Sequence, residues 1–140
     1  MKRYLIVEDE ILSRTILQTF FAGFAVCDTA ENGQQAIEMF TKAIIDGKPY
    51  DLVCTDLEMP VLDGYSLISR IRELEESMPV KDCIRTKIFV LSASDSPANI
   101  AHALLDCDCD DYIVKPLHRE QAASLLKKYH LLEGSDYNIP

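Results

Sequence analysis

The sequence has no long apolar run. Although 48% of its 140 residues are hydrophobic, no stretch approaches the roughly 18 consecutive apolar residues of a membrane-spanning helix. The first residues, MKRYLIVEDE, turn from basic to apolar, but the apolar stretch is short and three acids follow it. It is therefore expected to be a strand and not a signal peptide.

Basic residues are also scarce. Lys and Arg number 14 against 23 Asp and Glu, so the formal net charge is −9. Nucleic-acid binding needs a cluster of basic side chains to neutralise phosphates. Direct binding of this chain to nucleic acid is therefore not expected, and no membrane association is expected either.

The five cysteines are an odd number and include no CxxC pair. Cys27 and Cys54 lie in apolar runs, where a free thiol packs as a small hydrophobic group. Cys107 and Cys109 have no second pair of ligands elsewhere, so a metal site there is poorly supported. These features favour reduced thiols and a cytoplasmic location.

Short apolar segments alternate with segments of helical spacing. Five of the former are rich in β-branched or aromatic residues, as expected for strands buried on both faces: 4–7, 24–27, 52–54, 88–91 and 112–114. The helical sets are Leu12, Ile16, Leu17, Phe20; Ala36, Ile37, Phe40, Ile44; Leu67, Ile68, Ile71, Leu74; Ile100, Ala103, Leu104; and Ala122, Leu125, Leu126, Tyr129.

This alternation predicts an α/β protein, a doubly wound (βα)5 domain with a five-stranded parallel sheet and helices on both faces. We expect one domain at residues 1–130 and a short polar C-terminal tail at 131–140. The charged segment 73–81 is expected to link the third helix to the fourth strand.

Polar side chains follow the predicted strands, at the sheet edge where open α/β proteins bind ligands. The acids Glu8 and Asp9 follow the first strand, Asp56 the third, Ser92 ends the fourth and Lys115 follows the fifth. If the strand order is 2-1-3-4-5, Asp9 and Asp56 face each other. Clustered carboxylates without His or Cys favour Mg²⁺. Asp56 could then attack a phosphoryl group while Lys115 and Ser92 contact its oxygens.

These residues lie in motifs that resemble the receiver domain of two-component response regulators. The motifs are LIVEDE at 5–10, DLEMPVLDG at 56–64, VLSA at 90–93 and DDYIVKP at 110–116. The resemblance covers about residues 3–130, and it implies the flavodoxin-like fold with strand order 2-1-3-4-5.

The resemblance also implies a role for each matching residue. Asp56 would be the phosphoacceptor, and Asp9, Asp56 and the backbone carbonyl of Glu58 would hold Mg²⁺ with help from Glu8. Lys115 would pair with the phosphoryl group. Ser92 and Tyr112 would be the switch residues, and the Lys115–Pro116 bond would be a cis peptide.

One departure concerns the loop before DDYIVKP, where family members commonly carry glycine. Here the segment is Asp106–Asp110, and Asp108 is the residue best suited to a left-handed conformation. The face formed by the fourth helix, fifth strand and fifth helix is the family's usual output surface. Glu58 and Ser94 occupy positions that tune the lifetime of the phosphoryl group.

The resemblance therefore predicts a signalling domain that takes phosphate from a phosphohistidine on a histidine kinase or phosphotransfer protein. It would not be an enzyme beyond catalysing its own phosphorylation and dephosphorylation. Alternatives are a phosphate-independent binding module and a receiver excised from a hybrid kinase. A haloacid-dehalogenase-type phosphatase would need aspartate where Glu58 stands, and acids in the first loop would repel the phosphate of FMN. The kinase, target, pathway, lifetime and oligomeric state stay open.

Overall fold

The computed structural model describes residues 2–59, 61–77 and 85–132. Five parallel strands form one sheet in the order β2-β1-β3-β4-β5, as the sequence predicts. The strands are Arg3–Val7 (β1), Val26–Ala30 (β2), Leu52–Thr55 (β3), Lys87–Ser92 (β4) and Asp111–Val114 (β5).

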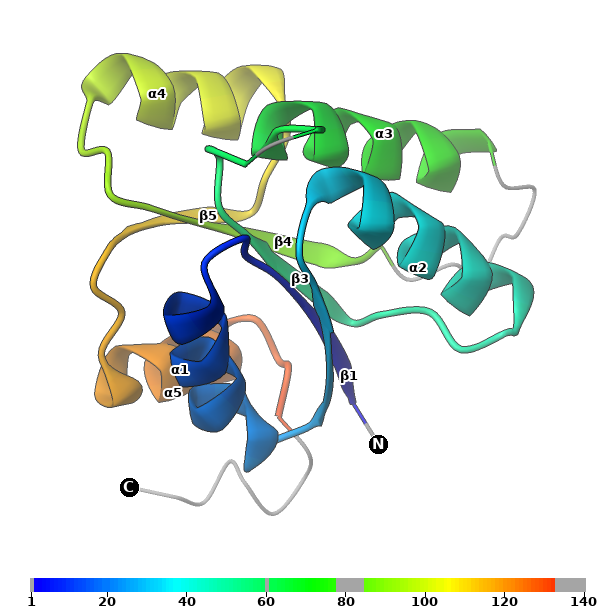
Figure 1. Cartoon of the computed structure of the whole chain (residues 1–140), viewed down its shortest axis with the longest axis horizontal. Coiled ribbons are helices and arrows are strands. Elements are labelled where there is room, and N and C mark those ends of the chain that lie inside the picture. The colour runs from blue at the N-terminus through cyan, green and yellow to red at the C-terminus, as the bar shows by residue number, and fades with distance from the viewer. Residues whose placement is uncertain (1, 60, 78–84, 133–140) are drawn as a thin grey trace.

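Helices cover both faces of the sheet. Figure 1 shows α2, α3 and α4 on one face, with α1 and α5 on the other. Their bounds are Ile11–Ala22 (α1), Gly33–Ile45 (α2), Gly64–Ser77 (α3), Pro97–Ala101 (α4) and Arg119–Lys128 (α5). A π-helical segment, η1 (His102–Asp106), continues α4 directly.

Two apolar clusters lie on opposite faces of the sheet because successive strand side chains alternate in direction. On β1, Leu5 and Val7 join the cluster beneath α2 and α3. Tyr4 and Ile6 join the cluster beneath α1 and α5. The sheet is therefore buried on both sides, as its nearly continuous apolar strands predict.

The second strand begins later than the predicted segment 24–27. Phe24 lies in the turn after α1, where its N–H donates to the carbonyl of Phe21, and β2 instead runs through the polar residue Asp28. Asp28 fits this edge strand because the hydroxyl of Tyr50 donates to its carboxylate at 2.6 Å. The apolar pattern alone could not reveal that partner.

Helix α1 is only partly buried. Leu17 and Phe21 face the core, whereas Leu12 and Ile16 of the predicted apolar face are 64% and 45% exposed. Ile11 is 71% exposed. The helix has more apolar residues than the sheet and α5 can cover. Ile11, Leu12 and Ile16 therefore form an exposed apolar row on α1, next to the loop after β1.

A left-handed residue ends the fourth helical segment. Asp108 has φ of 65°, the conformation that glycine adopts most easily. Its carbonyl accepts a hydrogen bond from Nε of the buried Arg72 at 3.1 Å. Arg72 also contacts Glu75 at 2.7 Å and Asp110 at 2.9 Å. This charged network joins α3 to the turn before β5.

The packed chain extends beyond the expected boundary at residue 130. Leu131 and Leu132 are 3% and 5% exposed and belong to the cluster beneath α1 and α5. The other residues of the expected tail, 133–140, lie outside the described residues. The predicted link 73–81 begins too early, because residues 73–77 continue α3, and residues 78–81 lie outside the described residues. Among the described helices, none has the length and apolar character needed to cross a membrane.

We predict that Arg72→Ala lowers the free energy of unfolding by about 3–5 kcal/mol, because it leaves two largely buried carboxylates without their partner. Urea unfolding followed by circular dichroism measures the change. Arg85→Ala is the matched control, since Arg85 pairs with Asp108 while its own side chain is 47% exposed, and it should cost about 0–1 kcal/mol. Equal effects of the two changes would contradict the assignment of a buried network.

Candidate functional site

The register of the sheet brings Glu8 and Asp56 together. Val7 is the partner of Thr55 across β1 and β3, so the next residue on each strand reaches the same edge. The N–H of Asp56 donates to the carbonyl of Val7 at 3.3 Å, which continues the ladder to the rim. Both carboxylates therefore lie where the carboxyl ends of the two central strands meet.

Lys115 enters this edge from the end of β5. Its Nζ lies 2.8 Å from Glu8 Oε2 and 2.8 Å from Asp56 Oδ2. The peptide bond between Lys115 and Pro116 is cis, and the N–H of Lys115 donates to the carbonyl of Ser92. One ammonium group is thus shared by two carboxylates from different strands.

The carboxylate of Asp56 is held by its own loop as well. Its Oδ1 accepts hydrogen bonds from the backbone N–H groups of Leu57 at 2.7 Å and Glu58 at 3.3 Å. The Asp56 side chain is 13% exposed. Its position is consequently fixed from two sides while one edge stays open to solvent.

Burial and charge pairing shift the pKa values of Glu8 and Lys115. Glu8 is 2% exposed, and this burial raises its pKa above the ordinary value although Lys115 acts in the opposite direction. Burial alone would lower the pKa of Lys115, but its hydrogen bonds to Asp56 and Glu8 outweigh that effect and the pKa is raised. Lys115 is therefore charged at neutral pH.

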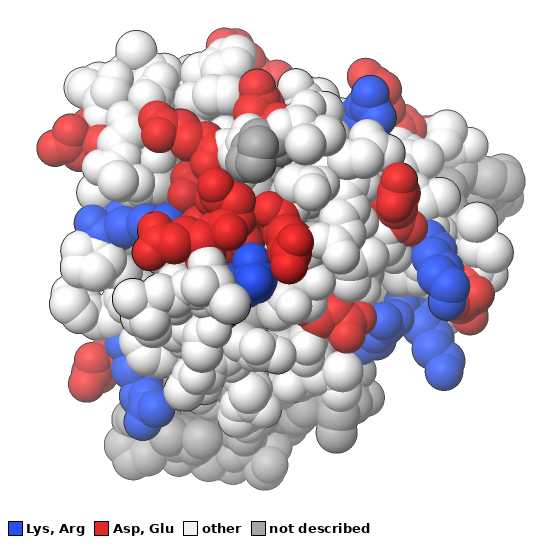
Figure 2. Space-filling model, viewed as in Figure 1, with Lys and Arg blue, Asp and Glu red and all other residues white. Residues whose placement is uncertain are grey.

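Acidic side chains gather in one patch on the face shown in Figure 2, over the loops that follow β1 and β3. Asp9 is exposed beside Glu8. When ionised, the three carboxylates of Glu8, Asp9 and Asp56 carry three negative charges, and Lys115 can neutralise only one of them. An excess of negative oxygen ligands suits a hard divalent cation such as Mg²⁺.

Within the described residues, no group of three or more His, Cys, Asp or Glu side chains is arranged to hold a metal. A cation at this edge would therefore complete its ligands with backbone carbonyl oxygen, water or phosphate oxygens. Magnesium commonly binds in this way, with only one or two carboxylates. The residues present fit such a site.

Ser92 and Tyr112 belong to a neighbouring hydrogen-bonded group. Ser92 is 2% exposed, and its Oγ accepts from the N–H of Ser94 at 3.2 Å. The hydroxyl of Tyr112 donates to the carbonyl of Ser94 at 2.8 Å. The structure thus groups Glu8, Asp56 and Lys115 at one point. The two predicted switch residues, at the end of β4 and on β5, both contact Ser94 in the loop after β4.

Sequence reasoning missed two supports of the site. Arg14 on α1 donates to the carbonyl of Glu8 at 2.9 Å, and a contact six residues away leaves no periodic signal. Gly64 is the other, because a Cβ at this position would lie 2.2 Å from the carbonyl oxygen of Asp56. The motif at 56–64 includes Gly64, but the close approach of this residue to the acidic site was not predicted.

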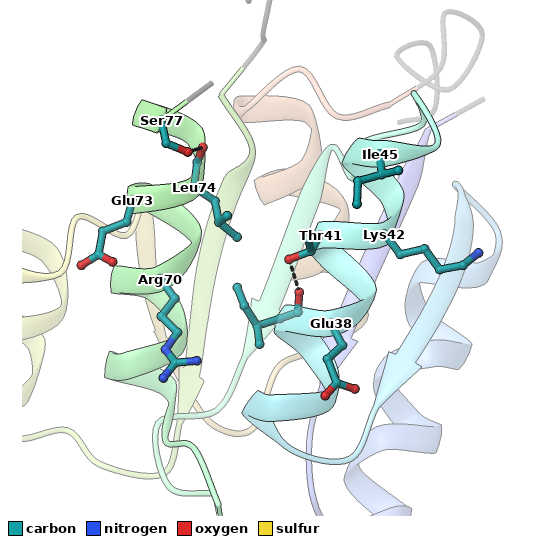
Figure 3. A pocket seen from close by; sticks show the side chains of 9 residues that line it. Glu38, Thr41, Lys42, Ile45, Arg70, Glu73, Leu74 and Ser77 are labelled. Carbon is teal, nitrogen blue, oxygen red and sulfur yellow. Dashed lines mark hydrogen bonds between the residues drawn. The ribbon is translucent and has the colours of Figure 1, made fainter. Parts of the chain in front are cut away.

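A cavity of about 910 Å³ between α2 and α3 lies apart from this site. Figure 3 shows the two helices side by side, with Thr41 and Ser77 among the lining residues. Their hydroxyls donate to carbonyls of their own helices, at 2.7 and 2.8 Å. These polar groups do not converge on a ligand position, so the acidic rim is the better candidate site.

Comparisons with known proteins agree with this geometry. The sequence profile of the response regulator receiver domain matches residues 4–127. Two-component response regulator ORR41 of Oryza sativa subsp. japonica is 34% identical over 134 residues, which cover 94% of this chain and 96% of that protein. The chain belongs to the response regulator receiver domain family and is a receiver domain of two-component signalling.

Two solved structures are similar in fold and sequence. One is the complex of the Saccharomyces cerevisiae phosphotransfer protein Ypd1 with the receiver domain of Ssk1 (27% identity, TM-score 0.76, covering 94% of this chain and 92% of that one). The other is the Thermotoga maritima response regulator TrrA with Mg²⁺ and BeF (29%, 0.71, 92% and 99%). Some relatives are far longer: this chain spans 11% of hybrid signal transduction histidine kinase F of Dictyostelium discoideum.

We predict that Lys115→Met lowers the free energy of unfolding in metal-free buffer by about 1–2 kcal/mol, because two adjacent carboxylates lose their shared cation. The cost should shrink when Glu8→Gln is present as well. A double-mutant cycle by urea unfolding measures this coupling. Additive effects of the two changes would show that Lys115 and Glu8 do not interact.

Proposed function

We propose that the protein is a phosphorylation switch in which Asp56 accepts a phosphoryl group from a phosphohistidine. The observation that carries this proposal is the carboxylate of Asp56, oriented by two backbone N–H groups and held 2.8 Å from the ammonium of Lys115. A carboxylate nucleophile next to a fixed positive charge is suited to phosphoryl transfer.

In the proposed reaction, a carboxylate oxygen of Asp56 forms a bond to phosphorus while the bond between phosphorus and the donor imidazole nitrogen breaks. The imidazole leaves as the neutral donor after taking up a proton. Lys115 then contacts the phosphoryl oxygens, and the hydroxyl of Ser92 donates a hydrogen bond to one of them. Hydrolysis of the acyl phosphate by water would return the carboxylate, so that the domain also catalyses its own dephosphorylation.

Asp9, Asp56 and the backbone carbonyl of Glu58 would hold Mg²⁺, with Glu8 acting from the second layer of ligands. The ion would neutralise charge on the phosphoryl oxygens when bound. The similarity to TrrA, whose structure contains Mg²⁺ and BeF, and the excess of acidic side chains at the rim support this assignment.

The exposed apolar row on α1 supports a docking site for the phosphate donor. Ile16 and Phe20 line a small cavity together with Lys115 and Pro116, and Leu12 is exposed on the same helix. A donor that covers this row would bring its phosphohistidine to the acidic rim. The similarity to the receiver of Ssk1, solved with the phosphotransfer protein Ypd1, supports a donor of this kind.

The output surface is proposed on the fourth helical segment, β5 and α5. Leu105 on η1 and Val114 on β5 are 80% and 40% exposed, so a partner could bury them. Phosphorylation would shift the hydrogen-bonded group of Ser92, Ser94 and Tyr112 between two packings and so change this surface.

We expect acetyl phosphate with Mg²⁺ to add one phosphoryl group to the wild type. Asp56→Asn should abolish the adduct, because its amide is a poor nucleophile, and EDTA should abolish it in the wild type. Intact-mass spectrometry measures both results. Asp63→Asn is a matched control at the start of α3. If neither acetyl phosphate nor a phosphohistidine protein gave an adduct, a phosphate-independent binding module would become the better description.

We further predict that the double variant Leu12→Ala, Ile16→Ala slows transfer from a phosphorylated histidine phosphotransfer protein at least about tenfold, because each lost apolar contact weakens docking by about 1 kcal/mol or more. Its phosphorylation by acetyl phosphate should be unchanged. Ile45→Ala on α2 is the control, since Ile45 is 77% exposed at a different surface. Equal loss with both donors would show that the row supports the fold instead.

A further inference from the structure

Cys107, His102 and Asp106 form a chain of contacts at the end of the fourth helical segment, away from the acidic rim. Cys107 Sγ lies 3.7 Å from His102 Nε2. His102 Nδ1 lies 2.7 Å from Asp106 Oδ2. A thiol, an imidazole and a carboxylate thus stand in the order that nucleophilic sites use for nucleophile, base and orienting group.

The π-helical turn produces this arrangement. Residues five apart on an α-helix point in different directions because 3.6 residues complete a turn. Here the N–H of Cys107 donates to the carbonyl of His102 at 3.1 Å, and this wider turn brings the two side chains onto one side. Asp106 follows His102 by four residues and reaches the other ring nitrogen.

The carboxylate of Asp106 fixes the tautomer of His102. It accepts the Nδ1–H, so that Nε2 keeps its lone pair facing the thiol. Tyr65 packs against the imidazole, with ring centroids 4.4 Å apart, and this contact restricts the orientation of the ring. The imidazole is therefore positioned to take the proton of Cys107.

Cys107 needs such a base to react. Burial raises the pKa of its thiol, and the nearby Asp106 acts in the same direction, although a hydrogen bond from Ser69 favours the thiolate. The resting group is consequently a protonated thiol. Cys109 provides a comparison within the chain, because it has the same 6% exposure and burial raises its pKa to about 12.

A cavity of about 430 Å³ opens onto the thiol. Its lining includes Cys107, His102 and Asp106 on one side and Ser69, Arg70 and Glu73 of α3 on the other. Figure 3 shows Glu73 pointing away from α2, toward the side of α3 on which this cavity lies. The lining carries one basic side chain, Arg70, and two acidic ones, Glu73 and Asp106, so it offers partners for both charges of a small zwitterionic molecule.

We propose that Cys107 is a site of reversible thiol modification by a low-molecular-mass, zwitterionic disulfide, with His102 as the general base and Asp106 as its positioning residue. The thiol proton passes to His102 Nε2, and the sulfur attacks one sulfur of the disulfide. A new S–S bond forms and the original one breaks. The departing thiolate takes the proton from His102, so one mixed disulfide and one free thiol result.

The test is incubation of the folded full chain with oxidised glutathione, followed by acid quenching and peptide mass mapping over time. We expect Cys107 to gain the adduct at least about tenfold faster than Cys109, because general-base assistance is commonly worth 10²–10⁴-fold. His102→Gln should remove that advantage, and Asp106→Asn should reduce it. In concentrated urea the two cysteines should react at similar rates.

His118→Gln is the matched control, because it makes the same chemical change at the start of α5. Thermal unfolding of each variant separates loss of the base from loss of the fold. A Cys107 rate no greater than that of Cys109, an undiminished rate in His102→Gln, or the absence of an adduct on either cysteine would overturn the proposal. Phosphorylation of Asp56 is measured separately, so neither result depends on the other.

Discussion

The ammonium group of Lys115, shared by Glu8 and Asp56, is the interaction on which the arrangement of the site depends. It joins the end of β5 to the ends of β1 and β3 across the sheet. Two carboxylates 4 Å apart repel by about 4 kcal/mol at an effective dielectric constant near 20, so the pair needs a cation in order to remain together. The parallel register brings the two carboxylates to the same edge of the sheet, and the charge of Lys115 offsets their mutual repulsion.

The sequence predicted the fold well because its strands are buried on both faces. Short apolar runs such as 52–54 and 88–91 match β3 and β4 closely, and the acids, hydroxyl and lysine fall at the strand ends where the topology brings them together. The resemblance to receiver domains then supplied the strand order. Burial on both sides is what makes such strands easy to recognise.

The errors have a common physical cause. β2 is an edge strand that tolerates Asp28 because Tyr50 and Arg3 contact its carboxylate, and a search for apolar residues ends it too early. Leu12 and Ile16 have the spacing of a buried face but lie in solvent, since spacing cannot say how much surface the neighbours cover. The contact of Arg14 with the carbonyl of Glu8 leaves no periodic pattern either, because six residues separate the two partners.

The separation of the two apolar clusters by the sheet has a consequence for the divergence of such domains. Residues beneath α1 and α5 and those beneath α2 and α3 belong to different clusters, and substitutions without shared neighbours usually have additive effects on stability. Core packing on one side can therefore change over generations with little compensating change on the other.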